Sequence, residues 1–210
     1  MKYEWRKVEA EYMTKAKPEK RLMPPQQFLT IKGQGNQNSP EFAEKVGALY
    51  AVSYALKMMP RKGIEVAGYQ DYVVYPLEGF WTMPDDFTGG AINKDLLIYE
   101  IMIKQPFFVT DALVEKAKEM SVKKVSESLL ASLEFKTIDE GEVVQMLHKG
   151  SFDEEYLSFE KMALFCEENN LNRTGYHHKE IYLSDIRKVT PDKYKTILRI
   201  GVEPRTKMEN

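Results

Sequence analysis

One pattern occurs twice in this chain and constrains its fold more than any other feature. FLTIKGQGNQNSPEFAEKV (28–46) resembles VVQMLHKGSFDEEYLSFEKM (143–162), and each indicates a strand, a glycine turn, a polar cap and a helix. Two later strand-like pairs also correspond, YVVYPLEG with KEIYLSD and YEIMIKQP with LRIGVEP, which aligns Tyr75 with Tyr182. Two copies are too few and too long for a solenoid. The sequence therefore predicts an α+β fold of duplicated β-α-β-β units, forming a pseudo-symmetric domain with a ligand groove between the halves.

The predicted domain spans residues 26–204. Its halves cover about 26–106 and 134–204, and a helical segment that starts near Thr110 joins them. Residues 1–25 are charged throughout and are predicted to be a polar N-terminal lead-in.

Local signals place several element ends. Ser39 is predicted to cap a helix that has Pro40 at its first position. The segment YQDYVVYPLEGFW is predicted to be a strand that ends near Pro76, because proline cannot donate to a sheet ladder.

Composition excludes several function classes. With 210 residues and a net charge of −2, the chain has no overall attraction for nucleic acid, and no DNA-binding motif occurs. The single cysteine, Cys166, excludes an internal disulfide and a multi-cysteine metal site, and it favours the reducing cytoplasm. No signal peptide and no apolar run of about 18 residues appears. We therefore expect a cytoplasmic monomer or homodimer without membrane, metal, cofactor or direct nucleic-acid partners.

Three acids sit among apolar or aromatic neighbours. Glu100 lies inside LLIYEIMI, Glu78 follows Pro76, and strand alternation places Glu180 on the same face as Tyr182. A carboxylate in such surroundings has a raised proton affinity, which suits acid–base chemistry, although each acid can also be solvated or paired with a lysine.

Aromatic side chains are candidates for the wall of an apolar slot, although core packing explains them equally well. The candidates are Tyr50, Tyr54, Phe80, Trp81 and Tyr182. The adjacent His177 and His178 point to opposite faces of a strand, which argues against a shared metal ion. His148 is a further predicted ligand-binding residue.

Several motifs resemble the GyrI-like small-molecule-binding family, in its stand-alone bacterial branch. They are GALYAVSYALKM, YVVYPLEGFW, IMIKQPFFVT, QMLHKGSFDEE and HHKEIYLSDIRK, and the resemblance runs from about Pro24 to Val202. The chain departs from the family pattern at Lys104, Phe107, Ile186 and Gly201, of which Ile186 changes the turn after Asp185.

The resemblance implies a deep aromatic-lined groove with a buried acid, which accepts bulky and often cationic aromatic compounds. It also implies, for some stand-alone members, hydrolysis of the activated cyclopropane of DNA-alkylating natural products, which protects the cell. The family's aromatic wall carries over to Tyr50, Tyr54 and Trp81, and its acids to Glu78 and Glu180. Its strand phenol carries over to Tyr182, whereas the transfer to Glu100 is weaker because close relatives often lack an acid there.

Two function classes follow. As an enzyme, the protein adds water to an electrophilic carbon, with Glu180 as the base and Tyr182 as a donor to the developing oxyanion. As a binding module, it sequesters or senses cationic aromatic compounds through charge pairing and cation–π attraction. A protein-binding inhibitor is a third, weaker reading.

Overall fold

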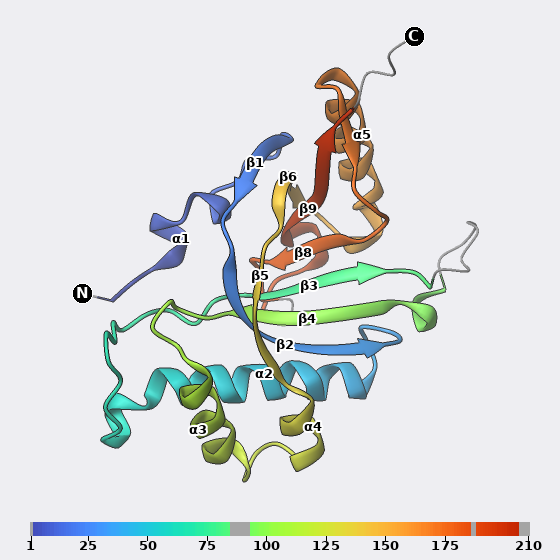
Figure 1. Cartoon of the computed structure of the whole chain (residues 1–210). Helices are drawn as coiled ribbons and strands as arrows, with labels where there is room; N and C mark the ends of the chain where they lie inside the picture. The colour runs from blue at the N-terminus through green and yellow to red at the C-terminus, as the bar shows by residue number, and fades with distance from the viewer. Residues whose placement is uncertain (1, 85–92, 186–187, 206–210) are drawn as a thin grey trace.

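The computed structural model describes residues 2–84, 93–185 and 188–205, which combine helices with an antiparallel sheet (Figure 1). The fold is therefore of the predicted α+β class. The strands are β1 (Glu19–Met23), β2 (Gln26–Gln34), β3 (Leu77–Thr82), β4 (Ile98–Lys104), β5 (Glu134–Ile138), β6 (Gly141–Lys149), β7 (Leu171–Arg173), β8 (His178–Tyr182) and β9 (Lys195–Pro204). The α-helices are α1 (Trp5–Val8), α2 (Pro40–Met58), α3 (Asp111–Ser121), α4 (Glu127–Ser132) and α5 (Tyr156–Glu168).

The strands form one sheet in the order β1-β6-β9-β8-β3-β4-β2-β5, and β7 pairs with β9. Every ladder is antiparallel, and β8 meets β3 where the two parts of the chain join. Both predicted halves contain their expected elements, which are β2, α2, β3 and β4 in the first and β6, α5, β8 and β9 in the second. Superposition of the two halves stays a prediction.

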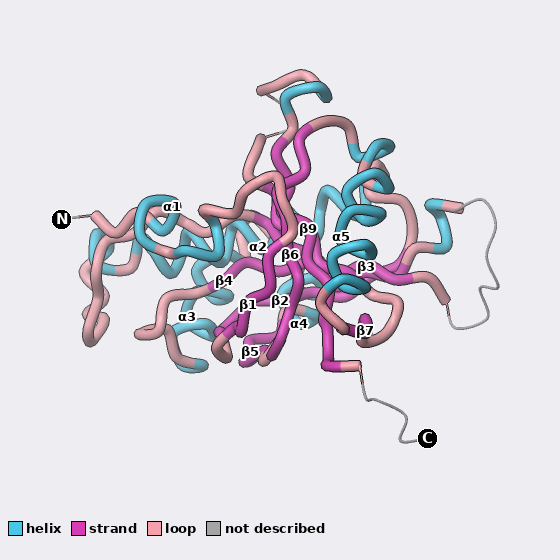
Figure 2. Tube along the Cα trace, turned by 90° about the horizontal axis from the view of Figure 1, so that it is seen from above, coloured by secondary structure: helices cyan, strands magenta, loops and turns pink. Residues whose placement is uncertain are grey.

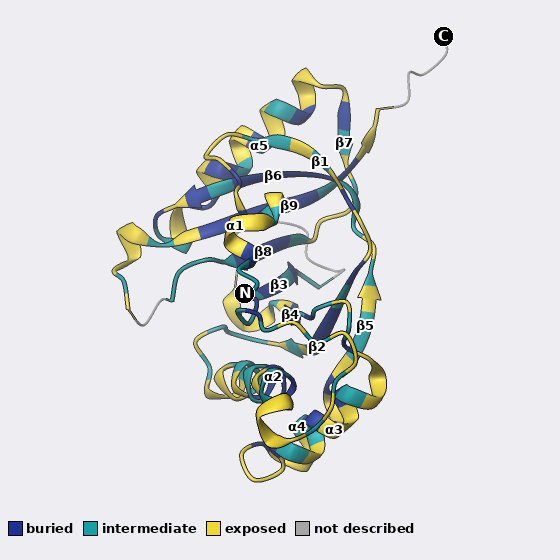
Figure 3. Ribbon diagram, turned by 90° about the vertical axis from the view of Figure 1, so that its left-hand side faces the viewer, coloured by how far each residue is buried: buried dark blue, intermediate teal, exposed yellow. Residues whose placement is uncertain are grey.

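Two helices cover one face of this sheet, which we call the helix face. The α2 helix packs there against Leu29, Ile101 and Ile103 of the first half. The α5 helix packs there against Val144, Met146 and Leu198 of the second half. Cross-strand partners share a face, so Gly79, Glu180 and Leu198 all lie on it. Figure 3 shows that β6 and β9 are buried along much of their length.

The N-terminal residues cover part of the opposite face, which we call the N-terminal face. Seen from above, α1 and α5 lie on opposite sides of β6 and β9 (Figure 2). The expected polar lead-in forms α1 and β1 and buries Trp5, Tyr12 and Met23. Its charged residues serve this packing, since Glu9 and Glu11 both bind Lys104 of β4, at 2.6 and 2.8 Å.

The helix starts follow the predicted capping. The Ser39 side chain accepts from the Phe42 backbone N–H at the start of α2, and Thr110 accepts from Leu113 at the start of α3. Gly33 allows the Tyr99 ring to cross β2, because a Cβ at this glycine would lie 2.4 Å from that ring.

One local prediction was wrong. The strand near Pro76 begins after the proline, at Leu77, and residues 69–76 contribute only the isolated Tyr3–Tyr72 bridge. Proline lacks the N–H that a central strand needs on both sides, so the ladder starts beyond it. The alignment of Tyr75 with Tyr182 stays a prediction, like the superposition of the halves; Tyr75 precedes β3, whereas Tyr182 is the last residue of β8.

None of the helices in the described ranges combines the length and the apolar content needed to cross a membrane.

Candidate functional site

The site is built on alternate residues of β8 that face the helix side of the sheet. His178, Glu180 and Tyr182 occupy these positions, and Trp81 of β3 lies opposite His178. Glu180 is only 7% exposed, and its Oε1 lies 3.0 Å from Nε2 of His178. Strand alternation therefore gathers an acid, a phenol, an imidazole and an indole on one face, as predicted for Glu180 and Tyr182.

The start of α5 lies opposite these residues. The Phe152 ring meets the Tyr182 ring edge-on at 6.0 Å, and the Phe159 ring meets the His178 ring at 4.9 Å. Glu155 lies between Phe152 and Phe159 in the sequence, as Glu180 lies between His178 and Tyr182. These two ring contacts, together with the effect of the Glu180 charge on Glu155, place the two carboxyl groups near each other.

Glu155 is a buried carboxyl with little to stabilise its charge. It is 7% exposed, and its Oε1 has no hydrogen-bond partner among the residues that the structure describes. Burial, followed by repulsion from Glu180, raises the pKa of Glu155 to about 9. At neutral pH Glu155 therefore holds its proton.

Tyr182 links Trp81 to Glu180. Its hydroxyl oxygen accepts a hydrogen bond from Nε1 of Trp81 at 2.9 Å, and the hydroxyl also hydrogen-bonds Glu180. Burial, followed by the Glu180 charge, raises the pKa of Tyr182 well above its ordinary value, whereas the Trp81 bond lowers it. The phenol is thus neutral and donates its proton toward Glu180.

Gly79 leaves the space that this arrangement needs. It lies directly opposite Glu180 on β3, and a Cβ there would lie 3.0 Å from Nε1 of Trp81 and 3.2 Å from Ile101. The glycine of the PLEG motif therefore lets the indole lie against the strand and reach Tyr182.

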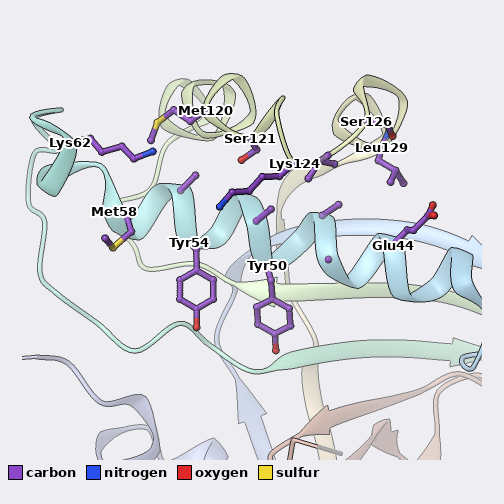
Figure 4. A pocket seen from close by; sticks show the side chains of 15 residues that line it. Glu44, Tyr50, Tyr54, Met58, Lys62, Met120, Ser121, Lys124, Ser126 and Leu129 are labelled. Atoms are coloured by element: carbon purple, nitrogen blue, oxygen red, sulfur yellow. The ribbon is translucent and has the colours of Figure 1, made fainter. Parts of the chain in front are cut away.

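The α2 helix contributes aromatic residues to the same side of the sheet. The Phe42 ring contacts those of Trp81 and Tyr99 at 5.8 and 5.1 Å. Tyr50 and Tyr54 follow at intervals of eight and four residues, and their rings lie 6.4 Å apart. Figure 4 shows both rings projecting from α2 away from α3 and α4. Tyr54 is 52% exposed, so it offers its ring to solvent on that side.

A hollow of about 800 Å³ lies along α2, toward α3 and α4, and the predicted ligand-binding residues Tyr50 and Tyr54 are among the residues that line it (Figure 4). Small α2 residues form its floor, and Met58, Met120 and Leu129 add apolar side chains. The charged side chains that line it are Glu44, Lys62 and Lys124, and none of them is a buried acid. The hollow is thus separate from the Glu155–Glu180 pair and lacks its acid–base groups.

Three predicted site residues lie on the N-terminal face instead, so the structure does not bring them together with Glu180. Register places Phe80 opposite Lys179 and Glu100, and Glu78 opposite Met102. Glu100 forms an ion pair with Lys136. Phe80 packs near the Lys179 ammonium, which lies 5.2 Å from its ring centre.

Glu78 belongs to a buried network of alternating charge. Lys179 Nζ lies 2.7 Å from Glu78 and 2.8 Å from Glu140, and Arg199 Nη1 lies 2.7 Å from Glu140. The Tyr12 hydroxyl donates to Glu78 at 2.9 Å. Burial opposes ionisation of Glu140, but attraction to Lys179 and Arg199 outweighs it and lowers its pKa. This network neutralises its own charges and holds the N-terminal segment on the sheet.

His148 lies on the helix face beside α5, but both ring nitrogens have partners. Nδ1 lies 2.9 Å from the Ser158 hydroxyl, and Nε2 lies 3.0 Å from the Ser151 carbonyl oxygen. Ser158 follows Glu155 by three residues, so His148 anchors the turn that carries Glu155. Its contacts therefore indicate a positioning role.

Glu155 is the residue that sequence reasoning missed. It stands in SFDEEYL, where three consecutive acidic positions before a helix resemble an ordinary charged first turn. The only usable signal was the apolar spacing of Phe152 and Phe159 on either side of it.

Within the described ranges, no three His, Cys, Asp or Glu side chains gather as a metal site.

Comparison with solved structures finds close likeness over the full length. A protein from Listeria innocua described as a hydrolase is 36% identical, covers 96% of this chain and 100% of its own, and has a TM-score of 0.87. An uncharacterized conserved protein from the same organism is 37% identical, with the same coverage and a TM-score of 0.89. The C-terminal domain of EcmrR is 14% identical, with 90% and 98% coverage and a TM-score of 0.55, and shows a shared fold only.

No curated protein matches the chain. The model of the GyrI-like small molecule binding domain matches residues 16–203, nearly the whole chain. Together with the Listeria likeness, this match shows that the chain belongs to the GyrI-like small molecule binding domain family.

Proposed function

We propose that this protein binds bulky aromatic compounds beside Glu180 and opens activated cyclopropane rings in them by adding water. The observation that carries the proposal is the buried Glu180, which lies next to Tyr182 and Trp81 on the helix face. A buried carboxyl beside a phenol is suited to acid–base chemistry. The Listeria relative described as a hydrolase supports a hydrolytic reaction.

Glu180 acts as the base in this proposal. Its carboxylate removes a proton from a water molecule while the water oxygen forms a bond to a ring carbon of the substrate. The strained C–C bond breaks, and its electron pair moves into the conjugated dienone, which becomes a phenolate. The proton on Glu180 then passes to this phenolate, so the products are the opened phenol and an enzyme in its starting state.

Tyr182 stabilises the negative charge that develops on the substrate oxygen. The Trp81 N–H donates to the Tyr182 oxygen at 2.9 Å, which strengthens the phenol as a hydrogen-bond donor. In the free protein the phenol bonds Glu180. When a substrate oxygen takes this bond, the Glu180 oxygen that accepted it is free to accept a hydrogen bond from water. Substrate binding thus couples the oxyanion donor to the base.

A time course by mass spectrometry tests this proposal with a spirocyclopropyl cyclohexadienone as the substrate. We expect the wild-type protein to add one water to the probe, and E180Q to lose turnover by about 10²–10⁴-fold, the usual contribution of a general base. Binding of the opened phenol should be retained in E180Q, because the charge is needed mainly in the transition state. E160Q, on the exposed face of α5, is the matched control. Absence of product with wild-type protein would reject the hydrolase.

Binding without turnover is the second candidate, supported by the same buried carboxylate among aromatic rings. A cationic aromatic ligand would pair with Glu180 and stack on neighbouring rings. In that case E180Q weakens cationic ligands by roughly 1–2 kcal/mol and leaves neutral ligands unchanged. A calorimetric titration with one cationic ligand and its neutral isostere separates this outcome from the hydrolase.

A further inference from the structure

We propose that the same site also hydrolyses aryl-substituted epoxides, with Glu155 donating a proton to the epoxide oxygen while Glu180 activates water. The inference rests on the proposed hydrolase function and extends it to a second class of strained three-membered ring. It adds a specific role for a residue that the cyclopropane reaction leaves unused.

Neighbouring ring contacts fix the position of Glu155, but one of its carboxyl oxygens has no hydrogen-bond partner among the described residues. Phe152 and Phe159 anchor it opposite Glu180 through their ring contacts with Tyr182 and His178. The side chain is 7% exposed, yet its Oε1 has no hydrogen-bond partner within the described residues. A buried polar atom without a partner is destabilising, so a purely structural role would leave this cost without a compensating gain.

The opposite face shows how the fold treats acids that serve structure. The side chains of Glu78 and Glu140 are only 2% and 8% exposed, and each lies within 2.8 Å of the Lys179 ammonium. Glu155 has no such ion pair among the residues that the structure describes, and its nearest charged neighbours include a second carboxylate. This contrast makes Glu155 a proton carrier.

Epoxide opening needs an acid that cyclopropane opening does not. When the cyclopropyl dienone opens, the negative charge becomes a delocalised phenolate, for which a hydrogen bond suffices. When an epoxide opens, the charge becomes a localised alkoxide, which is far more basic and must be protonated as the C–O bond breaks. Glu155, with its pKa near 9, is a stronger acid than Tyr182, whose pKa is raised well above 10.

The step balances without any other reactant. Water gives one proton to Glu180, and its oxygen bonds to one epoxide carbon. The C–O bond at that carbon breaks, and the oxygen takes the Glu155 proton, which yields a vicinal diol. Glu180 is then protonated and Glu155 ionised, and direct transfer between the facing carboxyls restores the starting state.

The test follows trans-stilbene oxide in H₂¹⁸O, with the spirocyclopropyl dienone measured in parallel. Wild-type protein should form the diol with one ¹⁸O atom, well above the protein-free rate. E155Q should lose epoxide turnover by about 10²-fold or more, yet retain cyclopropane turnover within about threefold. Glutamine copies the neutral carboxyl in size, so the variant is expected to fold. E160Q is again the exposed control on α5.

A pH profile of the wild-type protein gives a readout that does not depend on folding of a variant. Epoxide turnover should fall about tenfold per pH unit above about 9 as Glu155 loses its proton, while cyclopropane turnover should not. The pH at which this decrease begins depends on the ionisable groups near Glu155. These groups are Glu180, Asp153, Lys94, His178 and Tyr182.

Each result decides the inference. Cyclopropane opening without diol formation would reject the epoxide activity and keep the proposed function, whereas failure of both reactions would reject both. Diol formation that E155Q leaves intact would show that Glu155 is not the proton donor and would overturn the inference.

Discussion

The two faces of the central sheet bury acids in opposite ways. On the N-terminal face, Lys179 and Arg199 neutralise Glu78 and Glu140 at distances of 2.7–2.8 Å. On the helix face, Glu180 meets Glu155, which burial and like charge keep protonated. The ion pairs of the N-terminal face compensate the cost of burying charge. On the helix face, the buried Glu155 keeps its proton and can give it to a bound molecule. This difference separates scaffold from candidate active site along the single strand β8, where Lys179 and Glu180 are neighbours.

The largest effect should come from breaking the charged network. In K179M, Glu78 and Glu140 lose their shared ammonium while both remain buried, so we expect the free energy of unfolding to fall by about 3–5 kcal/mol. Urea denaturation measures this loss. K161M, exposed on α5, should change it by less than about 0.5 kcal/mol. Equal stabilities of K179M and K161M would show that the network is not structural.

A backbone-level change should disturb the helix face. The Cβ of G79A would lie 3.0 Å from Nε1 of Trp81 and 3.2 Å from Ile101, so the indole must move and its bond to Tyr182 weakens. We expect a loss of about 1–3 kcal/mol in stability together with reduced turnover. G47A in α2 is the control, since no heavy atom lies within 4 Å of its added methyl group and it should stabilise the helix by about 0.5–1 kcal/mol. Thermal unfolding of both variants compares them, and an unperturbed G79A would exclude the proposed role of this glycine.

The E155Q variant removes the ionisable group from position 155 and so tests whether the helix face buries a neutral acid. The folded protein holds this proton to a pKa of about 9, against an ordinary value of 4.5 for the unfolded chain. The unfolded chain therefore releases the proton first, and wild-type stability should decline as pH rises from about 4.5 toward 9. E155Q does not titrate at this position, so its stability relative to wild type should grow between pH 5 and pH 8 by about 4 kcal/mol. Parallel stability profiles of the two proteins would contradict the buried neutral acid.

The smallest effect should come from Glu100. It pairs with Lys136 on the N-terminal face, where both side chains retain partial solvent contact at 19% and 32% exposure. We expect E100Q to change stability by less than about 1 kcal/mol and to leave ligand affinity unchanged, as measured by titration with the opened phenol. A loss of affinity in E100Q would place the ligand on the N-terminal face and would contradict the assignment of the ligand site to the helix face.

Much of the fold was predictable because its signals are local. Strand-like segments predicted β2, β4, β6, β8 and β9, and Ser39 and Thr110 marked helix starts through their side-chain caps. The packing of residues 1–25 on the sheet was not predicted, because charged residues dominate the composition of this segment. Their contribution depends on Trp5 and Tyr12, which contact residues about 70 positions away.

The site was harder to predict because it depends on which strands become neighbours. Alternation placed Glu180 and Tyr182 on one face, but it could not reveal that the β3–β8 ladder directs Glu78 to the other. Glu155 reaches the site through the docking of α5, which is a tertiary contact with no periodic signal of its own.

The two tryptophans of the chain allow the most direct test of the two-face account. Trp81 lies on the helix face and donates to Tyr182, whereas Trp5 lies with the N-terminal segment and donates to the Val74 carbonyl at 3.2 Å. Protein labelled with 5-fluorotryptophan gives one ¹⁹F signal for each, assigned with W5F. On titration with the ring-opened phenol, the Trp81 signal should shift and the Trp5 signal should stay in place. A shift of Trp5 alone, or of neither signal at saturating ligand, would contradict the assignment of the ligand site to the helix face.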